Sequence, residues 1–281
     1  MNTFEWTFMI WLGSMLAGFL GSLTGLGGGV VIVPMLALGF GIDIRYAAGA
    51  SLVAVIATSS GAAAAYVKEG FSNIRIGMFL EVATTLGALV GAFVTSMLST
   101  GTISILFGVI LVYSAFLSIQ KRREGEDSRG NQYTDPLAVR LKLNGSYPVP
   151  IGSALYQAQN VAAGFALMFG AGILSGLLGI GSGALKVLAM DRTMRLPFKV
   201  STTTSNFMIG VTAAASAGIY FSRGYIDPGL SMPVMLGVLP GALLGARQLV
   251  FARPRHLRLL FTGVILMLAV EMIYKGWTGR F

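Results

Sequence analysis

The sequence predicts an all-α polytopic membrane protein made of two homologous helical repeats. The first observation is composition: 54% of the 281 residues are hydrophobic and only 11% are charged, whereas soluble domains carry about 25% charged residues. The second is that several apolar runs approach the roughly 20 residues that a helix needs to cross a bilayer. The third is a glycine motif that occurs once in each half of the chain. Helices are the expected spans because they satisfy their own backbone polar groups in lipid.

The glycine motif reads Gly25-Leu26-Gly27-Gly28-Gly29 in the first half and Gly179-Ile180-Gly181-Ser182-Gly183 in the second. Residues 18–92 align without a gap on the segment that begins at Gly172, and 18 of the 75 aligned positions are identical. Chance in so biased a composition would give roughly 8%. The chain is therefore interpreted as a duplicated unit, and each copy opens with a hydrophobic segment that glycines interrupt.

The first repeat is expected to cover residues 1–119. Its apolar run 6–38 is too long for one span and too short for two, so we predict two shorter helices that meet at Gly25–Gly29. In the second of the helices that follow, Gly87 and Gly91 have the GxxxG spacing that lets membrane helices approach closely. The predicted helices after the broken hairpin cover residues 46–67, 74–98 and 102–119.

A basic loop is expected over residues 120–150, between the two repeats. This is the only clearly polar stretch of the chain, and it begins with Lys121-Arg122-Arg123. Its charges form no phosphate-binding pattern, and Lys and Arg are typical of cytoplasmic loops. We therefore predict that the loop lies in the cytoplasm.

The second repeat is expected to cover residues 151–281 and to follow the same plan. A broken hairpin is predicted at about 152–190. The first helix after it begins with an unusually polar run, Ser201–Asn206. The predicted helices of this repeat cover residues 200–221, 229–250 and 257–275.

The Lys and Arg residues also predict how the repeats are oriented. If each broken hairpin enters and leaves the membrane on the same side, the repeats are inverted and most Lys and Arg residues fall in loops on one side. If each hairpin is a single span, the repeats are parallel and the basic residues divide more evenly. Because basic loops stay in the cytoplasm, the inverted arrangement is favoured, with both chain termini outside.

Composition narrows the function classes further. The chain has no cysteine and a single histidine, His256 in a basic loop, which removes most metal sites and most Ser/His or Cys/His catalysis. We therefore expect a protein that is not an enzyme and has no metal and no cofactor. The net charge of +9 comes from Lys and Arg in short loops between apolar runs. It is interpreted as topology-setting charge in a protein that contacts the lipid bilayer and no nucleic acid.

The glycine motifs have two compatible interpretations. A phosphate-binding P-loop would need Gly-Lys-Ser/Thr after the glycines, but Val30-Val31 follows here. The glycines can serve helix packing. They can also break a helix so that its free N–H groups point at an anion, and duplicated broken helices are the best sequence indication of a transporter site.

The candidate anion site is therefore placed between the two glycine motifs. Glycine is expected there because a Cβ would hold the backbone away from a ligand and because the chain can need a positive φ. Hydroxyl and amide groups of the crossing helices are expected to complete the site. Thr58 and Thr212 lie on the same helices, where such side chains often bond only their own backbone. The candidate residues are Gly25, Gly27, Gly28, Gly29, Ser51, Gly179, Gly181, Ser182, Gly183, Lys186, Ser205 and Asn206.

Three charged residues fall within apolar segments. Lys186 lies three residues beyond Gly183 and is either a ligand inside the membrane or a lysine that snorkels to the interface. Glu81 either titrates during transport or pairs with Arg75. Glu271 is near a helix end and is expected to be exposed.

Together these motifs resemble the TauE/SafE family of sulfite and organosulfonate exporters. The resemblance rests on Gly18, the first glycine motif and Pro34, on the echo at Gly172–Gly183, on Ser51 and Ser205, and on the Gly87-Ala88 and Gly241–Arg247 segments. It covers nearly the whole chain. The second copy departs from the first, with Ser182 for the middle glycine, Leu188 for the proline and Lys186 where the first copy has Ile32.

The resemblance implies an inner-membrane carrier that exports a small sulfur-containing anion, sulfite or an organosulfonate. The alternative is import of a related oxyanion, such as thiosulfate or sulfate, by the same fold. A cation carrier would need carboxylates inside the membrane, where the sequence offers only Glu81.

Overall fold

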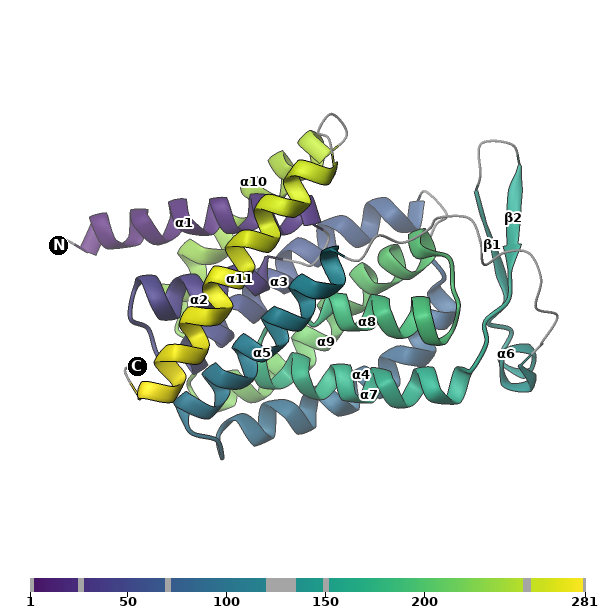
Figure 1. Cartoon of the computed structure of the whole chain (residues 1–281), viewed down its shortest axis with the longest axis horizontal. Helices are drawn as coiled ribbons and strands as arrows, with labels where there is room; N and C mark the ends of the chain where they lie inside the picture. The colour runs from purple at the N-terminus through teal and green to yellow at the C-terminus, as the bar shows by residue number, and fades with distance from the viewer. Residues whose placement is uncertain are drawn as a thin grey trace.

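The computed structural model describes residues 3–24, 28–68, 72–119, 135–148, 152–249 and 254–279. Helices form nearly all of it, and one small β-hairpin lies at one end of the bundle (Figure 1). In this part of the chain, four helices are long and apolar enough to cross a membrane. They contain the spans Phe4–Gly21, Ile74–Thr95, Val161–Leu178 and Pro228–Gly245.

The first half of the chain contains a broken helical pair followed by three long helices. α1 ends just before the first glycine motif and α2 begins at the last glycine of that motif, as predicted. The prediction of two shorter helices is wrong for α1, which has 22 residues and contains a full candidate span. The three helices that follow begin and end within about three residues of the predicted bounds. The elements are α1 (Thr3–Thr24), α2 (Gly29–Pro34), the π-helix η1 (Met35–Gly39), α3 (Ile44–Lys68), α4 (Ile74–Thr95) and α5 (Thr100–Ile119).

The second half repeats this order after two short elements that were not predicted. A turn of helix and a two-stranded antiparallel hairpin, with Gly145 opposite Tyr156, occupy a region expected to be loop or the start of the broken hairpin. The elements are α6 (Pro136–Arg140), β1 (Gly145–Pro148), β2 (Ser153–Tyr156), α7 (Val161–Leu178), α8 (Gly183–Leu188), η2 (Ala189–Thr193), α9 (Phe198–Ser222), α10 (Pro228–Leu249) and α11 (Pro254–Thr278).

Each short helix after a glycine motif widens into a π-helix. In the first half this change follows Pro34, which lacks a backbone N–H. In the second half Leu188 occupies the same place before η2. Proline is therefore not required for the π-turn, and its loss in the second copy does not alter the local fold.

Glycines allow the closest helix contacts, as the GxxxG spacing predicts. A Cβ on Gly87 or Gly91 of α4 would collide with the carbonyl oxygens of Phe169 and Ile173 of α7. The reverse also holds, because a Cβ on Gly176 of α7 would collide with the carbonyl oxygen of Ala88. Backbone thus packs directly on backbone between α4 and α7, which maximises dispersion contact between helices in lipid.

The helix pairing exchanges partners between the two halves. α1 packs on α10 and α7 packs on α4, whereas α3 packs on α9 and α5 packs on α11. The α1–α10 contact also depends on glycine, since a Cβ on Gly241 would collide with the carbonyl oxygen of Met15. This exchange is what a two-fold relation between the halves would require, while the repeat itself stays a prediction.

One end of the bundle, which we name the Arg45 end, gathers the loops after η1, α4 and α9. Arg45 Nη2 donates to the carbonyl oxygen of Leu98 at 2.6 Å, and Arg223 Nη1 donates to that of Phe93 at 3.0 Å. The ring of Trp6 meets that of Phe40 edge-on, which places the start of α1 here too. Both chain termini lie on this side of the molecule (Figure 1).

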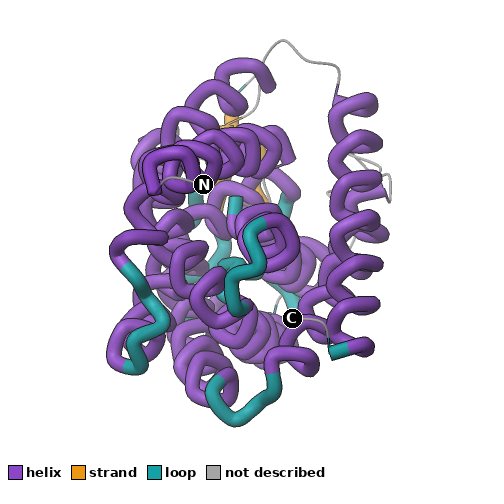
Figure 2. The backbone as a smooth tube through the Cα atoms, turned by 90° about the vertical axis from the view of Figure 1, so that its left-hand side faces the viewer, coloured by secondary structure: helices purple, strands orange, loops and turns teal. Residues whose placement is uncertain are grey.

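The opposite end, named the Asn73 end, carries the β-hairpin (Figure 1). The side-chain nitrogen Nδ2 of Asn73 donates to the hydroxyl of Tyr156 at 2.6 Å, and the backbone N–H of Asn73 donates to Thr204 Oγ1 at 3.1 Å. Asp135 accepts from the first amide of α7, Val161 N, at 2.8 Å. The starts of α4, α7 and α9 therefore meet at this end. Seen from the side of the termini, the strands lie behind the helices (Figure 2).

Apolar side chains cover the outside of the bundle. On α4 the exposed residues Met78, Val82, Leu86 and Phe93 form one face, whereas Leu80, Ala83 and Ala88 are buried against other helices. A helix that is apolar on its exposed face as well as on its buried face is typical of a membrane span.

Candidate functional site

The first glycine motif ends at the start of α2. Gly25 and Gly27 lie outside the described residues. Gly28 is the N-cap and has a right-handed backbone (φ −64°), so the predicted positive φ does not occur at this position. The first helical hydrogen bonds run from Val31 and Ile32 to the Gly28 carbonyl oxygen. The amides of Gly29 and Val30 precede them, and helix amides in this position have no partner within the helix.

The second glycine motif is a left-handed turn between α7 and α8. Gly179 and Gly181 have φ values of +69° and +71°, and Ser182 has +43°. Here the predicted need for a positive φ is confirmed, because residues with a Cβ rarely adopt it. The Ser182 hydroxyl donates to the carbonyl oxygen of Ala171 at 2.8 Å. It therefore fastens the turn to α7 and stands beside the N-terminus of α8.

The described residues of the two motifs meet beside α3. A Cβ on Gly29 would lie 2.7 Å from Ser51 Oγ and 3.2 Å from the Cα of Ile180. A Cβ on Gly179 would lie 2.7 Å from the carbonyl oxygen of Ala48. The first motif, the second motif and the Ser51 turn of α3 are thus in mutual contact, and we call this place the tip junction.

Hydroxyl groups border the tip junction. Ser51 is fully buried, and its Oγ has no hydrogen-bond partner in the part of the chain that the structure describes. Ser205 Oγ donates to the carbonyl oxygen of Gly183 at 3.3 Å, so α9 also reaches the second motif. Asn206 is half-buried and makes no hydrogen bond to the described residues of either motif. Of the predicted polar ligands, Ser51 and Ser205 are therefore brought together, and Asn206 is not.

Lys186 is completely enclosed by protein. It is 0% exposed, and its Nζ donates to Thr212 Oγ1 at 2.5 Å. A snorkelling lysine would extend its ammonium to water, and this one does not. Its role as an anion ligand stays a prediction.

Glu81 faces the same threonine from α4. Its Oε1 accepts from Thr212 Oγ1 at 2.6 Å and from Thr85 Oγ1 at 3.1 Å. Arg75, the partner considered from the sequence, is exposed in the first turn of α4, whereas Glu81 is buried further along the same helix. The connection of Glu81 to Lys186 through Thr212 was not predicted. The sequence drew attention to Thr212 because Thr58 stands at the matching position of the first half, whereas the partners of Thr212 come from α4 and α8.

Thr58, the counterpart of Thr212 in the first half, behaves differently. Its hydroxyl contacts the carbonyl oxygens of Ala54 and Val55 within its own helix, at 3.1 and 3.2 Å. Ile32 stands where the second half has Lys186, so the first half has no lysine at that position. The polar site is thus asymmetric between the halves.

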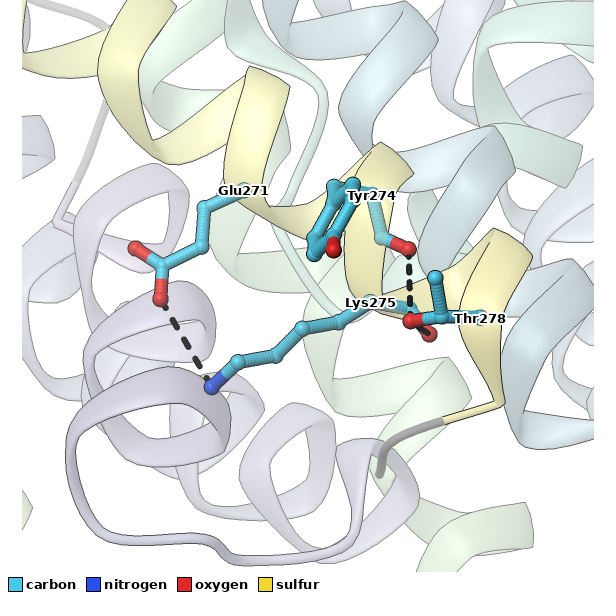
Figure 3. A network of polar contacts seen from close by, with 4 residues as sticks. All are labelled: Glu271, Tyr274, Lys275 and Thr278. Carbon is cyan, nitrogen blue, oxygen red and sulfur yellow. Dashed lines mark hydrogen bonds and ion pairs between the residues drawn. The ribbon is translucent and has the colours of Figure 1, made fainter.

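A hollow on α11 is separate from the tip junction. It measures about 330 Å³ and is lined by Val270, Ile273, Tyr274, Trp277 and Thr278, all from this one helix. Beside it Glu271 and Lys275 lie one turn apart with their charged atoms 3.6 Å apart (Figure 3). The Glu271 side chain is 42% exposed, as predicted. The apolar lining of the hollow and its position on the outside of α11 suit contact with lipid rather than binding of an anion.

Comparison with known proteins agrees with this description. The family profile "Sulfite exporter TauE/SafE" matches residues 10–272. The probable membrane transporter protein YunE of Bacillus subtilis (strain 168) is 25% identical over 269 residues, which are 93% of this chain and 95% of that protein. The probable membrane transporter protein YdhB of the same strain is 27% identical over 241 residues, which are 85% of this chain and 89% of that protein.

Relatives extend to archaea. The probable membrane transporter protein MJ0441 of Methanocaldococcus jannaschii is 22% identical over 272 residues, which are 92% of each chain. No solved structure matches the chain significantly. With its apolar helices and a family match over nearly its whole length, this multi-pass membrane protein belongs to the TauE/SafE family of transporters.

Proposed function

We propose that the protein exports a small sulfur-containing anion, sulfite or an organosulfonate, across the cytoplasmic membrane, and that the anion binds at the tip junction. The observation that carries the proposal is Ser51, a fully buried hydroxyl that has no hydrogen-bond partner among the described residues and lies where both glycine motifs meet. A buried polar group without a partner is costly. An anion that accepts a hydrogen bond from Ser51 would remove that cost.

The chemistry of the tip junction favours an anion over a cation. Its candidate donors are the first amides of α2 and α8, the hydroxyl of Ser51 and the ammonium of Lys186. Helix N-termini carry partial positive charge, which stabilises an anion without holding it as tightly as several full charges would. Such donors replace the water that an anion loses on entering the membrane.

We also propose that the two halves are inverted in the membrane. In support, α1 starts at the Arg45 end, where Trp6 meets Phe40, whereas α7 starts at the Asn73 end. The exposed basic residues at the Asn73 end favour the cytoplasm for that end. They are Arg75, Arg140, Lys142, Arg192, Arg195 and Lys199.

Export is proposed because the membrane potential favours it. A negative cell interior drives each net negative charge outward by about 2.3 kcal/mol per 100 mV. Import of thiosulfate or sulfate by the same fold is the other outcome that transport measurements can give.

The test is ligand-induced thermal stabilisation of the purified protein with sulfite, sulfoacetate, thiosulfate and sulfate, followed by flux into proteoliposomes. We expect sulfite or sulfoacetate to stabilise the wild type most, and Ser51→Ala to reduce that stabilisation. Ser14→Ala is the matched control, because Ser14 of α1 is equally buried and its hydroxyl also has no partner. Stabilisation by none of the four anions, or equal loss in both variants, would contradict the proposed site.

A further inference from the structure

A buried polar chain joins three helices beside the tip junction. It consists of Glu81 of α4, Thr212 of α9 and Lys186 of α8. Lys186 Nζ donates to Thr212 Oγ1 at 2.5 Å, and Thr212 Oγ1 lies 2.6 Å from Glu81 Oε1. One hydroxyl thus separates a carboxylate from an ammonium. Lys186 is 0% exposed and Glu81 is 8% exposed, so the pair is held away from water.

Only one oxygen of the carboxylate is used. Oε1 of Glu81 accepts from Thr212 and Thr85, whereas Oε2 is enclosed and has no hydrogen-bond partner among the described residues. A buried carboxylate normally needs partners on both oxygens. Oε2 is therefore a place where a proton can reside.

Lys186 is the charged side chain that Thr212 links to Glu81. α4 packs on α7 and α9. α7 contains no titratable residue. On α9, Lys199 is exposed at the Asn73 end, and Tyr220 bonds Thr95 and Leu177 toward the Arg45 end. Two other charged residues lie on neighbouring elements. Arg75 of α4 is exposed, and Asp191 of η2 interacts with other groups.

One face of α9 connects the polar chain of Glu81, Thr212 and Lys186 to the tip junction. Ser205 bonds the carbonyl oxygen of Gly183, Ile209 packs where a Cβ on Gly181 would stand, and Thr212 follows. These residues are four and three positions apart, so they lie along one side of the helix. Lys186 lies one helical turn after Gly183 on α8, so its backbone adjoins the tip junction while its ammonium contacts Thr212.

We propose that Glu81 is a proton-binding site coupled to the anion site, so that one proton is bound together with each anion. The proposal rests on the proposed anion transport and adds the ion that accompanies it. Without the anion, Lys186 balances the charge of Glu81. An anion that binds Lys186 leaves the carboxylate uncompensated in a low-dielectric site, which is costly unless the charge is neutralised. Uptake of a proton on Oε2 neutralises it.

The step is balanced and needs no other reactant. The carboxylate of Glu81 gains one O–H bond, Lys186 keeps its three protons, and the proton comes from solvent. Thr212 can then turn its hydroxyl hydrogen to the carbonyl oxygen of Met208, which lies 3.0 Å away. A monovalent anion would thus move without net charge and a divalent anion with one net negative charge. The membrane potential would then still favour export of a divalent anion, whereas the concentration and pH gradients alone would set the direction for a monovalent anion.

The test counts protons taken up when sulfoacetate binds to the full-length protein in weakly buffered detergent solution with a pH-indicator dye. Sulfoacetate stays fully ionised between pH 6 and 8, because an ordinary carboxyl has a pKa of about 4. We expect the wild type to take up about one proton per anion, and its affinity to fall by up to tenfold per pH unit as pH rises. Glu81→Gln mimics the protonated state, so at pH 6, where Lys186 keeps its proton, it should bind sulfoacetate without proton uptake.

Glu271→Gln is the matched control, since Glu271 is also a carboxylate on a membrane helix paired with a lysine. It should behave as the wild type. Wild-type binding without proton uptake, or uptake that persists in Glu81→Gln, would overturn the coupling and leave the anion site standing. Absence of sulfoacetate and sulfite binding in the wild type would overturn both proposals.

A second measurement needs no variant and covers the case in which Glu81→Gln does not fold. Infrared difference spectra of the wild type should gain the C=O stretching band of a protonated carboxyl when sulfoacetate is added. An unchanged carboxyl region at saturating sulfoacetate would refute the proposal.

Discussion

Individual residues at the tip junction were predictable to different extents. The glycine spacing and the position of Lys186 predicted a buried polar site, because both lie inside apolar runs. Backbone angles were not predictable, since Gly28 is right-handed while Gly179 and Gly181 are left-handed in the matching motif. The partners of a buried side chain depend on packing between distant helices. Glu81 and Thr212 are 131 positions apart, and no local pattern connects them.

Gly29 is the residue of the first motif at which substitution should matter most. A Cβ there would meet the Ser51 hydroxyl at 2.7 Å, whereas at Gly28 the nearest atom would be 3.4 Å away, an ordinary contact. We expect Gly29→Ala to weaken anion-induced stabilisation of the protein by about tenfold in affinity, or about 1.4 kcal/mol. Gly28→Ala is the matched control. A larger loss from Gly28→Ala would mean that the ligand lies on the other side of the motif.

The Glu81 and Lys186 pair should show strong non-additivity in unfolding. Lys186→Met alone leaves a buried carboxylate without its counter-charge, and breaking a buried pair costs about 3–5 kcal/mol. The double variant Glu81→Gln with Lys186→Met removes both charges and should recover most of that loss. Thermal unfolding in detergent measures both variants.

The pair Glu271 and Lys275 is the control for this cycle. It is partly exposed with its charged atoms 3.6 Å apart, so Lys275→Met should change the free energy of unfolding by less than about 1 kcal/mol. Equal effects of Lys186→Met and Lys275→Met would show that the buried pair carries no special coupling.

At the scale of elements, helix positions were predictable because charged or turn-forming residues bound each apolar run. The predicted 74–98 became Ile74–Thr95, and 200–221 became Phe198–Ser222. The hairpin formed by β1 and β2 was not predictable, because its strands are four residues each and the first, Gly-Ser-Tyr-Pro, resembles a turn. Its position depends on Asn73 and Asp135, which contact it or anchor its flanks only in the folded chain.

The α4–α7 contact gives an element-scale prediction. A Cβ on Gly176 would collide with the backbone of Ala88, so Gly176→Ala should force the helices apart and destabilise the protein by about 1–3 kcal/mol. Gly170 lies on the same helix with nothing within 4 Å of its Cβ position. Gly170→Ala should therefore be neutral or slightly stabilising, because alanine favours the helix. Unfolding temperatures of both variants in detergent provide the comparison, and similar values would argue against backbone-to-backbone packing.

At the scale of the whole molecule, the membrane class and the family could be predicted. The apolar composition holds along most of the chain, and the glycine motif occurs in both halves. The exchange of helix partners could not, since nothing in the sequence states that α1 contacts α10 and α7 contacts α4. The same exchange places the starts of α1 and α7 at opposite ends of the bundle. The placement of the two helix starts therefore leads to a prediction about how the halves are oriented in the membrane.

Accessibility labelling tests that orientation. The chain has no cysteine, so single introduced cysteines report without background. Ser146 is exposed on β1 at the Asn73 end, and Thr278 is exposed at the end of α11 on the side of the termini (Figure 1). In intact spheroplasts, a membrane-impermeant maleimide should label Thr278→Cys and should label Ser146→Cys only after the cells are opened.

The physical reason for this expectation is the charge difference between the two ends. Transfer of the six exposed Lys and Arg residues of the Asn73 end across the membrane would oppose the membrane potential and the retention of basic loops in the cytoplasm. Labelling of both cysteines from the same side would contradict the arrangement of the two ends on opposite faces of the membrane. The reverse pattern, with Ser146→Cys labelled from outside, would preserve the inverted halves but would turn the basic end outward, against the positive-inside rule.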